Sequence, residues 1–481
     1  MKTKKMMKLM LGCTVIASSL SFMSCKPGED PNGKTTIKFW HTFGGQVQIA
    51  VDTKIDEFEK IYMEKFGKEI DVVSEYQGGY VDILKKINLS FSSGLTPTVA
   101  VAYPDHVAEY LSNQTKPEEY VINLEKYFDD EEIGFAAQDY FNPNLKGEED
   151  LVPSFLEEGQ NYIEAGTYSM PLMKSSEVLL YNKGMVDRVL QDMGILNTES
   201  YMRNLTWDNF IAILKFAKKD LTKYGNFLNV PYAHDSDSNL FISQSYQRGI
   251  DFISIKDGKG SIDFNNPEAR TLVREIKSYY DDGLLVTKGT EGTYSSDIFK
   301  DEECMFTVGS TGGAGYNDPG QAGFEVGVCK VPSAAKSEEL SKYVSQGVTL
   351  TLLNNTGVSA EINEKRTDIG WQLIKYLTSS DNNVDICLDT NGYAPVRESS
   401  YTSDVYTEYL AEDEFMPKTA RVVYEDIAGK YYNYPVFKGS ATAREAVGGL
   451  VTQALLSSNF EGELDKLFQD AENLARLSLK N

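Results

Sequence analysis

The stretch TTIKFWHTFGG, residues Thr35–Gly45, decides the fold because it joins a strand pattern to the start of a helix. Ile37 and Phe39 alternate with more polar neighbours, which predicts a β-strand, and the glycine pair at its end predicts a turn. Apolar residues then recur every three or four positions, which predicts an amphipathic helix along the stripe Val47, Val51, Ile55, Phe58, Tyr62 and Phe66. We therefore expect this helix to pack on a sheet that contains the strand.

The same alternation continues along the chain. Residues 70–76 have a strand pattern, 80–93 a helix pattern and 98–103 a strand pattern. Strands that alternate with helices predict a parallel sheet with right-handed crossovers. A second α/β region follows, with a predicted strand pair around 166–171 and 177–181 and helices that begin near Thr206 and Asn266. Because 481 residues exceed what one hydrophobic core usually supports, we expect an α/β protein with two lobes.

The ends of these strands provide the first candidate ligand contacts. In open α/β sheets, ligands bind beyond the carboxyl ends of the strands. The sequence places Trp40, Tyr80 and Asp105 at this edge of the predicted sheet. Packing remains the alternative role for each aromatic residue, since most Tyr and Trp side chains are largely buried.

Three turn-like motifs add further candidates. In MKSSEVLLYN, residues 173–182, Ser176 and Glu177 stand just before an apolar strand, and an exposed turn is the alternative. In GSTGGAGYND, residues 309–318, Ser310 can donate a hydrogen bond, but the motif lacks the Gly-Lys-Ser/Thr ending of a phosphate loop. Tyr393 follows Asn391-Gly392, a turn signal.

The composition argues against several classes of function. The chain has 71 acidic and 47 basic residues, a formal net charge of −24, which disfavours nucleic acid and anionic lipid as partners. Neither the cysteine spacing nor the three histidines predict a metal site, and we expect no cofactor. No Walker loop, Gly-x-Ser-x-Gly elbow or HExxH motif is present, so no catalytic residue is predicted. The sequence does not exclude a pair of carboxylates for glycoside hydrolysis, but nothing in it singles out such a pair.

The first residues predict export. Residues 1–24 have the basic start and apolar middle of a signal peptide. The segment ending at Cys25 resembles the lipobox of bacterial lipoproteins, although Phe22 stands where leucine is usual. Cleavage would make Cys25 the lipidated N-terminus, and residues 25–34 a tether at the cell membrane, facing the periplasm or exterior. A simple cleaved signal with an incidental Cys25 is the alternative, and Cys13 is a rival lipidation site.

Seven motifs in order resemble a known family across nearly the whole mature chain: TTIKFWHTFGG, GTYSMPLMKSSEVLLYNKGMV, LTWDNF, IFKDEECMFTVGS, FEVGVCKVP, GWQLIKYLTSSDN and NGYAPVRESSY. They are similar to the extracellular solute-binding proteins of carbohydrate ABC importers, the maltose-binding-like family. The FWH strand is most similar to the glycerol-3-phosphate-binding branch.

The resemblance implies a type II periplasmic-binding-protein-like fold, with parallel-rich sheets and a hinge between two lobes. On this basis we expect residues 35–145 and 324–378 in the N-terminal lobe, and 146–323 and 379–481 in the C-terminal lobe. It also implies a monomer that closes around a sugar and delivers it to permease subunits.

By position, the resemblance suggests ligand contacts at Tyr80, Ser176, Ser310, Gly347 and Tyr393, while Trp40, Asp105, Glu177 and Lys438 complete the predicted site. The chain departs from the branch where an arginine is expected ahead of the late helix, since it reads Pro435-Val436-Phe437-Lys438 there. Phosphate recognition favours arginine, so this departure favours a neutral sugar or oligosaccharide. Glycerol 3-phosphate or a glycerophosphodiester is the alternative ligand, and a surface-anchored glycoside hydrolase is the alternative of another class.

Overall fold

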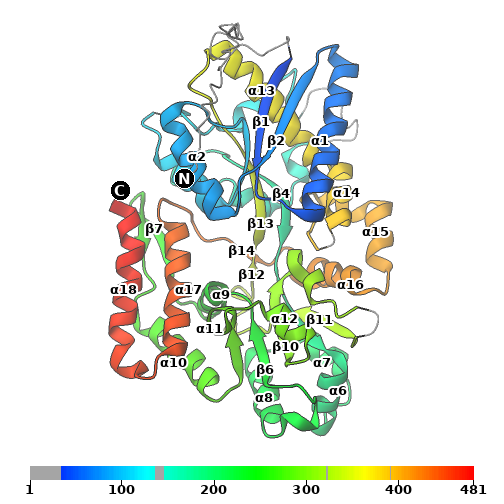
Figure 1. The fold of residues 1–481 in the computed structure, drawn as a ribbon, viewed down its shortest axis with the longest axis vertical. Helices are drawn as coiled ribbons and strands as arrows, with labels where there is room; N and C mark the ends of the chain where they lie inside the picture. Colours follow the sequence, from blue (N-terminus) through cyan, green and yellow to red (C-terminus); the bar gives the residue numbers. More distant parts are fainter. Residues whose placement is uncertain (1–33, 117, 136–145, 321–322, 391, 481) are drawn as a thin grey trace, which may run out of the picture.

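The computed structural model describes residues 34–116, 118–135, 146–320, 323–390 and 392–480. The predicted signal peptide, Cys25 and the tether up to residue 33 lie outside the described residues. Two five-stranded sheets form the centres of two lobes, which lie one above the other in Figure 1. The predicted two-lobed α/β fold is therefore confirmed.

The first lobe is built on a sheet with strand order β2-β1-β3-β13-β4. Its strands are β1 (Thr35–His41), β2 (Ile70–Tyr76), β3 (Val99–Ala102), β13 (Gln346–Leu352) and β4 (Met170–Ser175). β1 pairs in parallel with β2 and β3, as predicted, whereas β13 runs antiparallel to β3 and β4. In β1 the alternating residues Ile37, Phe39 and His41 are buried, which explains why this segment forms a strand.

Helices cover the first sheet (Figure 1): α1 (Gly45–Phe66), α2 (Tyr80–Ser93), α3 (Pro104–Ser112), α13 (Ala360–Leu377) and α14 (Ser380–Thr390). Most of the predicted stripe of α1 faces inward, with Val51, Ile55 and Phe58 almost fully buried, whereas Phe66 at the end of the helix is exposed. Burial of such side chains, rather than helix propensity, supplies most of the stability of a helix like this one.

The second lobe is built on a sheet with strand order β11-β5-β10-β6-β9. Its strands are β11 (Val326–Lys330), β5 (Glu177–Asn182), β10 (Cys304–Ser310), β6 (Val230–His234) and β9 (Leu285–Thr287). Major helices of this lobe are α8 (Trp207–Lys218), α9 (Asp237–Arg248), α10 (Pro267–Asp281), α12 (Ser295–Lys300), α17 (Ser440–Leu456) and α18 (Phe460–Lys480). α17 packs on α9, α10 and α18. The predicted helix starts are confirmed, since Thr206 caps α8 and Asn266 caps α10.

The chain passes between the lobes at two very short junctions. Ser176 alone separates β4 of the first sheet from β5 of the second, and Ser345 alone separates β12 (Tyr343–Val344) from β13. The expected strand pair around 166–171 and 177–181 is therefore wrong, because the apolar run is shared between two cores. The sheets also divide the chain differently from the predicted ranges, since β4 belongs to the first lobe and β11 to the second.

A two-stranded ladder, β12–β14, lies between the lobes. β12 pairs in parallel with β14 (Tyr431–Tyr432), so the junction before β13 is joined to a later segment that also runs between the lobes. Successive residues of a strand point to opposite faces. Accordingly, Tyr432 lines a cavity on one face of the ladder, and Tyr431 lines a rear cavity of about 620 Å³ on the other.

Remaining helical elements connect these parts: α4 (Glu125–Phe128), η2 (Glu148–Asp150), α5 (Pro153–Glu158), α6 (Lys183–Asp192), α7 (Thr198–Arg203), η3 (Leu221–Lys223), α11 (Lys288–Glu291), η4 (Thr311–Asn317), η5 (Glu398–Thr402), α15 (Asp404–Ala411), α16 (Phe415–Val422) and the π-helical η6 (Val423–Ile427). A separate hairpin joins β7 (Ile253–Lys256) to β8 (Lys259–Ile262). None of the described helices is both long and apolar enough to cross a bilayer.

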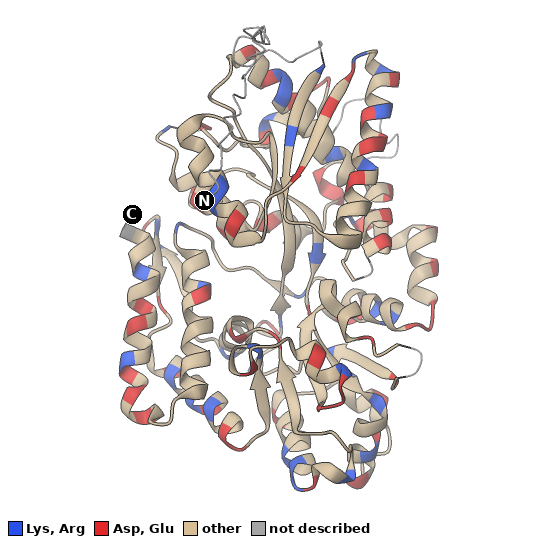
Figure 2. Cartoon of the chain, viewed as in Figure 1, with Lys and Arg blue, Asp and Glu red and all other residues tan. Residues whose placement is uncertain are grey.

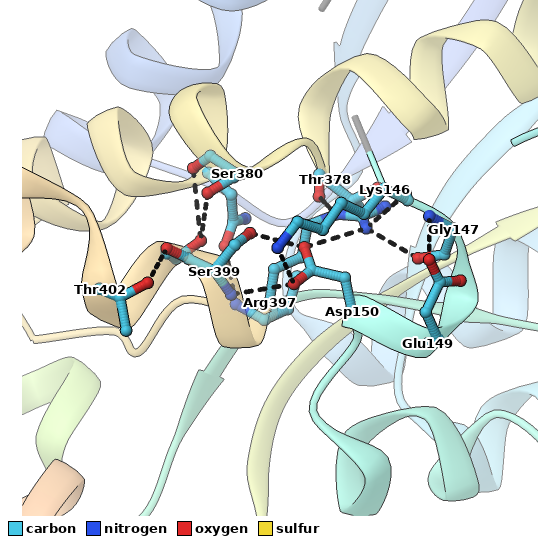
Figure 3. A network of polar contacts seen from close by, with 12 residues as sticks. Lys146, Gly147, Glu149, Asp150, Thr378, Ser380, Arg397, Ser399 and Thr402 are labelled. Carbon is cyan, nitrogen blue, oxygen red and sulfur yellow. Dashed lines mark hydrogen bonds and ion pairs between the residues drawn. The ribbon is translucent and has the colours of Figure 1, made fainter. Parts of the chain in front are cut away.

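A buried arginine fixes the loop after α14 to the first lobe (Figure 3). Arg397 donates from Nε to the carbonyl of Thr378 at 2.5 Å and from Nη1 to the carbonyls of Lys146 and Gly147 at 3.0 and 3.1 Å. Asp150 accepts hydrogen bonds from the backbone N–H and the hydroxyl of Ser399. This network holds the segment that carries residues 392–400 in place.

Cys304, Cys329 and Cys387 are all buried and free. No disulfide joins these three cysteines, the ones that the structure describes.

Candidate ligand-binding site

A cavity of about 190 Å³ lies between the two lobes, against the β12–β14 ladder. The first lobe contributes residues that follow β3 together with α5 and β4, and the second lobe contributes α9, the β7 strand and α17. The lining residues used below are Tyr103, Asp105, Glu158, Lys174, Asn239, Ser345, Gln346, Gly347, Tyr432, Tyr434 and Arg444. The cavity therefore draws side chains from both sheets and from the junction between them.

Unpartnered polar atoms gather in the wall of this cavity. Buried side-chain atoms without a hydrogen-bond partner occur on five of its residues: Asp105 Oδ1, Glu158 Oε1, Ser345 Oγ, Gln346 Oε1 and Tyr434 O–H. A buried polar atom left without a partner costs about 1–3 kcal/mol, and native proteins contain few of them. Their concentration here indicates a place where a ligand supplies the missing hydrogen bonds.

An ion pair joins the lobes across the cavity. Arg444, on α17 of the second lobe, donates from Nη2 and Nε to Asp105 Oδ2 at 2.6 and 3.1 Å. Its guanidinium also lies 5.4 Å from the ring centre of Tyr103. Burial is the largest single influence and raises the pKa of Asp105, but the charges and hydrogen bonds of Arg444 and His106 together hold this pKa below its ordinary value. Asp105 is thus a carboxylate at neutral pH.

A second ion pair lies wholly within the first lobe. Lys174 Nζ on β4 lies 2.5 Å from Glu158 Oε2 at the end of α5, and the two side chains are 1% and 8% exposed. The ammonium also sits 5.5 Å from the ring centre of Phe155. The backbone of Lys174 exchanges hydrogen bonds with Ala394, so the Arg397-anchored loop braces this wall.

Two of the predicted contacts, Asp105 and Gly347, line the cavity. Gly347 has a φ of +101°, and a Cβ added there would lie 2.1 Å from the carbonyl oxygen of Met173. Only glycine fits this backbone, because the left-handed conformation and the close approach both exclude a side chain.

Tyr80 lies one ring behind the cavity wall. Its ring stacks on that of the wall residue Tyr103, with centroids 4.1 Å apart. Trp40 is directed elsewhere, since its indole N–H donates to Glu75 at 2.5 Å. Neither residue is among those that line the cavity.

The two predicted serines form hydrogen bonds within the protein near the junction between the lobes. Ser176 donates from its hydroxyl to the carbonyl of Val344 at 2.8 Å, which links the two junctions. Ser310 donates to the hydroxyl of Ser175 at 3.2 Å and caps the 3-10 helix η4. The alternative of an exposed turn at Ser176 is wrong, because the residue is fully buried between the two sheets.

Glu177 stands directly behind the cavity wall. It accepts a hydrogen bond at 2.8 Å from Asn239, which does line the cavity, and lies 4.0 Å from Nε2 of His234. Burial, with a smaller contribution from Asp235, raises the pKa of Glu177 to about 7 despite the bond from Asn239. Burial lowers the pKa of His234 to about 3. The pair is therefore largely uncharged in mildly acidic solution.

The remaining two predicted contacts, Tyr393 and Lys438, also lie outside the cavity lining. Tyr393 packs against Gly312, where an added Cβ would lie 2.8 Å from the tyrosine ring. Lys438 is partly buried before α17 and contributes positive charge near Glu109.

Sequence reasoning missed most of the charged and polar wall: Glu158, Lys174, Gln346, Tyr434 and Arg444. An arginine does line the cavity, as Arg444 in the second turn of α17 and not ahead of that helix. The inference that the site lacks an arginine is therefore wrong.

Comparison with known proteins places this geometry in context. A family model described as bacterial extracellular solute-binding protein matches residues 55–412. The sn-glycerol-3-phosphate-binding periplasmic protein of Escherichia coli strain K12 is 21% identical over 376 residues, which cover 76% of this chain and 75% of that protein.

Two solved structures share the fold. The cyclic alpha-maltosyl-1,6-maltose binding protein of Arthrobacter globiformis superposes with a TM-score of 0.66 at 17% identity, covering 93% of this chain and 100% of that one. UgpB of Mycobacterium tuberculosis, in complex with glycerophosphocholine, has a TM-score of 0.67 at 16% identity, with 93% and 99% covered.

Proposed function

The chain belongs to the bacterial extracellular solute-binding protein family, and from this premise we propose that it captures a sugar or oligosaccharide between its lobes for an ABC importer. The permease subunits of that importer would receive the ligand. Relatives of the same fold bind a cyclic maltosyl-maltose and glycerophosphocholine, which supports an organic solute with several hydrogen-bonding groups.

The cluster of unpartnered atoms carries the proposal. Asp105, Glu158 and Gln346 offer acceptor oxygens, while Ser345 and Tyr434 offer hydroxyls that donate or accept. Sugar hydroxyls complement such a set because each is both a donor and an acceptor. The aromatic rings of Tyr432 and Tyr434 give the wall apolar surface against which a sugar ring can pack.

Closure follows from the same arrangement. The wall belongs to both lobes, so a ligand that contacts both stabilises the arrangement in which they approach each other. The short junctions at Ser176 and Ser345 and the β12–β14 ladder provide the hinge. No covalent bond is made or broken in this cycle, so the protein acts by binding alone.

Thermal unfolding with a panel of sugars tests the proposal. A ligand that binds only the native state stabilises it by about 2.7 kcal/mol at one hundred times its Kd. We expect at least one mono- or oligosaccharide to raise the Tm, and the variant Gln346→Ala to reduce that rise. Chromatography of the same mixtures should show intact sugar. Released monosaccharide would instead favour the glycoside hydrolase alternative, and a panel without any shift would exclude sugar binding.

A second ligand class is favoured by Arg444. This arginine is the side chain that a phosphate would need, and a relative is named for binding glycerol 3-phosphate. Against this ligand, Arg444 is already paired with Asp105. Glycerol 3-phosphate is therefore included in the thermal panel. The ligand class that raises the Tm more at equal concentration is the favoured one.

Export and anchoring complete the proposal. An extracellular solute-binding protein is exported, and the signal-like residues 1–24 followed by Cys25 supply a route to a lipid anchor. Metabolic labelling with a fatty acid should mark the wild-type protein in cells, and Cys25→Ser should abolish the label. Label that persists in Cys25→Ser but disappears in Cys13→Ser would move the anchor to Cys13.

A further inference from the structure

The four charged side chains that line the cavity form two pairs. Asp105 pairs with Arg444 across the lobes, and Glu158 pairs with Lys174 within the first lobe. Their formal charges cancel, with two acidic and two basic residues. The pairing of both cations distinguishes this wall from a phosphate site, in which arginine or lysine is left free for the ligand.

The Glu158–Lys174 pair is the less expected of the two. Removing both charges from water costs free energy that their attraction only partly returns, so apolar residues of similar size are often at least as stable. The pair also leaves Glu158 Oε1 buried without a hydrogen-bond partner. Stability alone therefore does not explain why this pair stands in the cavity wall.

Geometry assigns the two groups different tasks. Lys174 is held by Glu158 Oε2, by the nearby Phe155 ring and by a backbone braced against Ala394, so its ammonium has little freedom to turn toward a ligand. Glu158 keeps one oxygen that is still able to accept. Asp105 repeats the pattern, since Oδ2 binds Arg444, while Oδ1 has no hydrogen-bond partner and lies 3.9 Å from Nε2 of His106.

We propose that Glu158 selects ligands by charge: its carboxylate neutralises Lys174 and leaves an acceptor oxygen for a ligand hydroxyl, so that the cavity admits uncharged polyols and rejects phosphorylated ones. This inference rests on the proposed function and names the substrate class of that site. A phosphate group placed here would lie beside two carboxylates that already pair with both cations, with Asp105 binding Arg444 through Nε and Nη2. An uncharged polyol meets the same acceptors, hydroxyls and N–H donors without this repulsion.

The substitution Glu158→Gln tests this assignment, because it keeps the size and an acceptor oxygen while it changes the charge of the wall from zero to +1. Calorimetric titration with glucose, glucose 6-phosphate and glycerol 3-phosphate compares matched ligands with and without a phosphate. We expect Glu158→Gln to bind glycerol 3-phosphate about tenfold or more tightly than the wild type does, since one unpaired charge in a partly desolvated site has at least this effect.

A matched double variant controls for charge. Glu158→Gln combined with Lys174→Met restores a neutral wall and should lose the gain in phosphate affinity. Asp105→Asn makes the same change of charge at the other pair and should also gain affinity for glycerol 3-phosphate. Asp105→Asn serves as the test if Glu158→Gln does not fold. The side chain of Arg444 is 38% exposed, so water can solvate its charge once its partner is removed.

Unchanged phosphate affinity in the folded single variants would overturn the inference, as would a wild type that binds glycerol 3-phosphate more tightly than any sugar. These results differ from failure of the proposed function. If the wild type binds no uncharged solute and the variants still gain phosphate affinity, charge selection by Glu158 stands while sugar capture does not.

Discussion

Single buried residues carry much of the chemistry of this protein. Glu177 illustrates this best, because the sequence showed only a carboxylate before an apolar strand. The structure buries it behind the cavity wall, bonded to Asn239 and close to His234. Burial raises the pKa of Glu177 to about 7, so its proton matters for stability in the neutral range.

The variant Glu177→Gln should change how stability depends on pH. The folded protein holds the Glu177 proton up to about pH 7, whereas the ordinary pKa is 4.5, so this residue lowers stability as pH rises between those values. The full effect is roughly 3 kcal/mol, since one pKa unit is about 1.4 kcal/mol. Gln keeps an acceptor for Asn239 and does not titrate.

Melting temperatures measured from pH 5 to pH 8 check this expectation. The Tm of Glu177→Gln minus that of the wild type should rise across the range. His234, whose pKa is lowered to about 3, makes the protein less stable as pH falls below 6.5. It is present in both proteins and cancels in the difference. A difference that stays flat with pH would show that Glu177 is already ionised throughout.

Residue-level prediction from sequence was uneven. Asp105 and Gly347 were named and do line the cavity, because strand ends and family motifs mark such positions. Glu158 and Arg444 were not named, since each meets its partner only through tertiary packing: Glu158 comes from α5 and Lys174 from β4, and Arg444 crosses from the other lobe. The spacing of residues along the sequence does not reveal these tertiary contacts.

Individual elements were predicted well where local signals agreed. β2 and α2 match the expected ranges, and Thr206 and Asn266 were recognised as helix starts and cap α8 and α10. The strand predicted at 177–181 is present as β5, but its predicted pairing with the strand before it failed, because Ser176 divides one apolar run between two sheets. Periodicity shows that a segment is buried, but it does not show which core receives it.

The cap of α8 provides a measurable test at this scale. The Thr206 hydroxyl accepts a hydrogen bond from the backbone N–H of Asn209 at 3.3 Å. Thr206→Ala should lower the free energy of unfolding by about 1 kcal/mol in denaturant titration. Thr271→Ala is the control, because Thr271 is exposed within α10 and caps no helix. If both changes lower the free energy of unfolding equally, the cap makes no specific contribution to stability.

The strand β13 provides a second test. Gly347→Ala places a Cβ 2.1 Å from the carbonyl oxygen of Met173 at a φ of +101°. It should destabilise the protein by more than about 1 kcal/mol and weaken sugar binding, because the cavity wall must move. Gly315→Ala, where an added Cβ meets nothing within 4 Å, should leave both quantities unchanged. A stable Gly347→Ala variant with full affinity would contradict this role.

At the scale of the whole molecule, acidic and basic residues are spread over the helices of both lobes (Figure 2), with a net charge of −24 over the full chain. Such an excess of negative charge repels anionic ligands and surfaces at long range. The sequence predicted two lobes from length and pattern. The sequence did not predict which strands belong to which lobe. That assignment depends on which sheet each strand joins by hydrogen bonds, and the local pattern does not contain this information.

Lobe motion should be visible in solution scattering. Adding the sugar that gives the largest thermal shift should reduce the radius of gyration, because a ligand held by both lobes draws them together. A sugar from the panel that gives no shift serves as the control and should leave the radius unchanged. A compact form that is identical with and without bound sugar would argue against hinge closure.

The β12–β14 ladder stands between two cavities, so rotation of the lobes about it should affect both. Tyr432 lines the cavity between the lobes, while its neighbour Tyr431 lines the rear cavity together with Tyr401 and Tyr424, whose rings stack with centroids 5.1 Å apart. Rotation that narrows the cavity between the lobes should therefore disturb this stacked pair. A dye attached at Ala428, beside the rear cavity, would thus work as a gauge that reads solute capture without touching the solute.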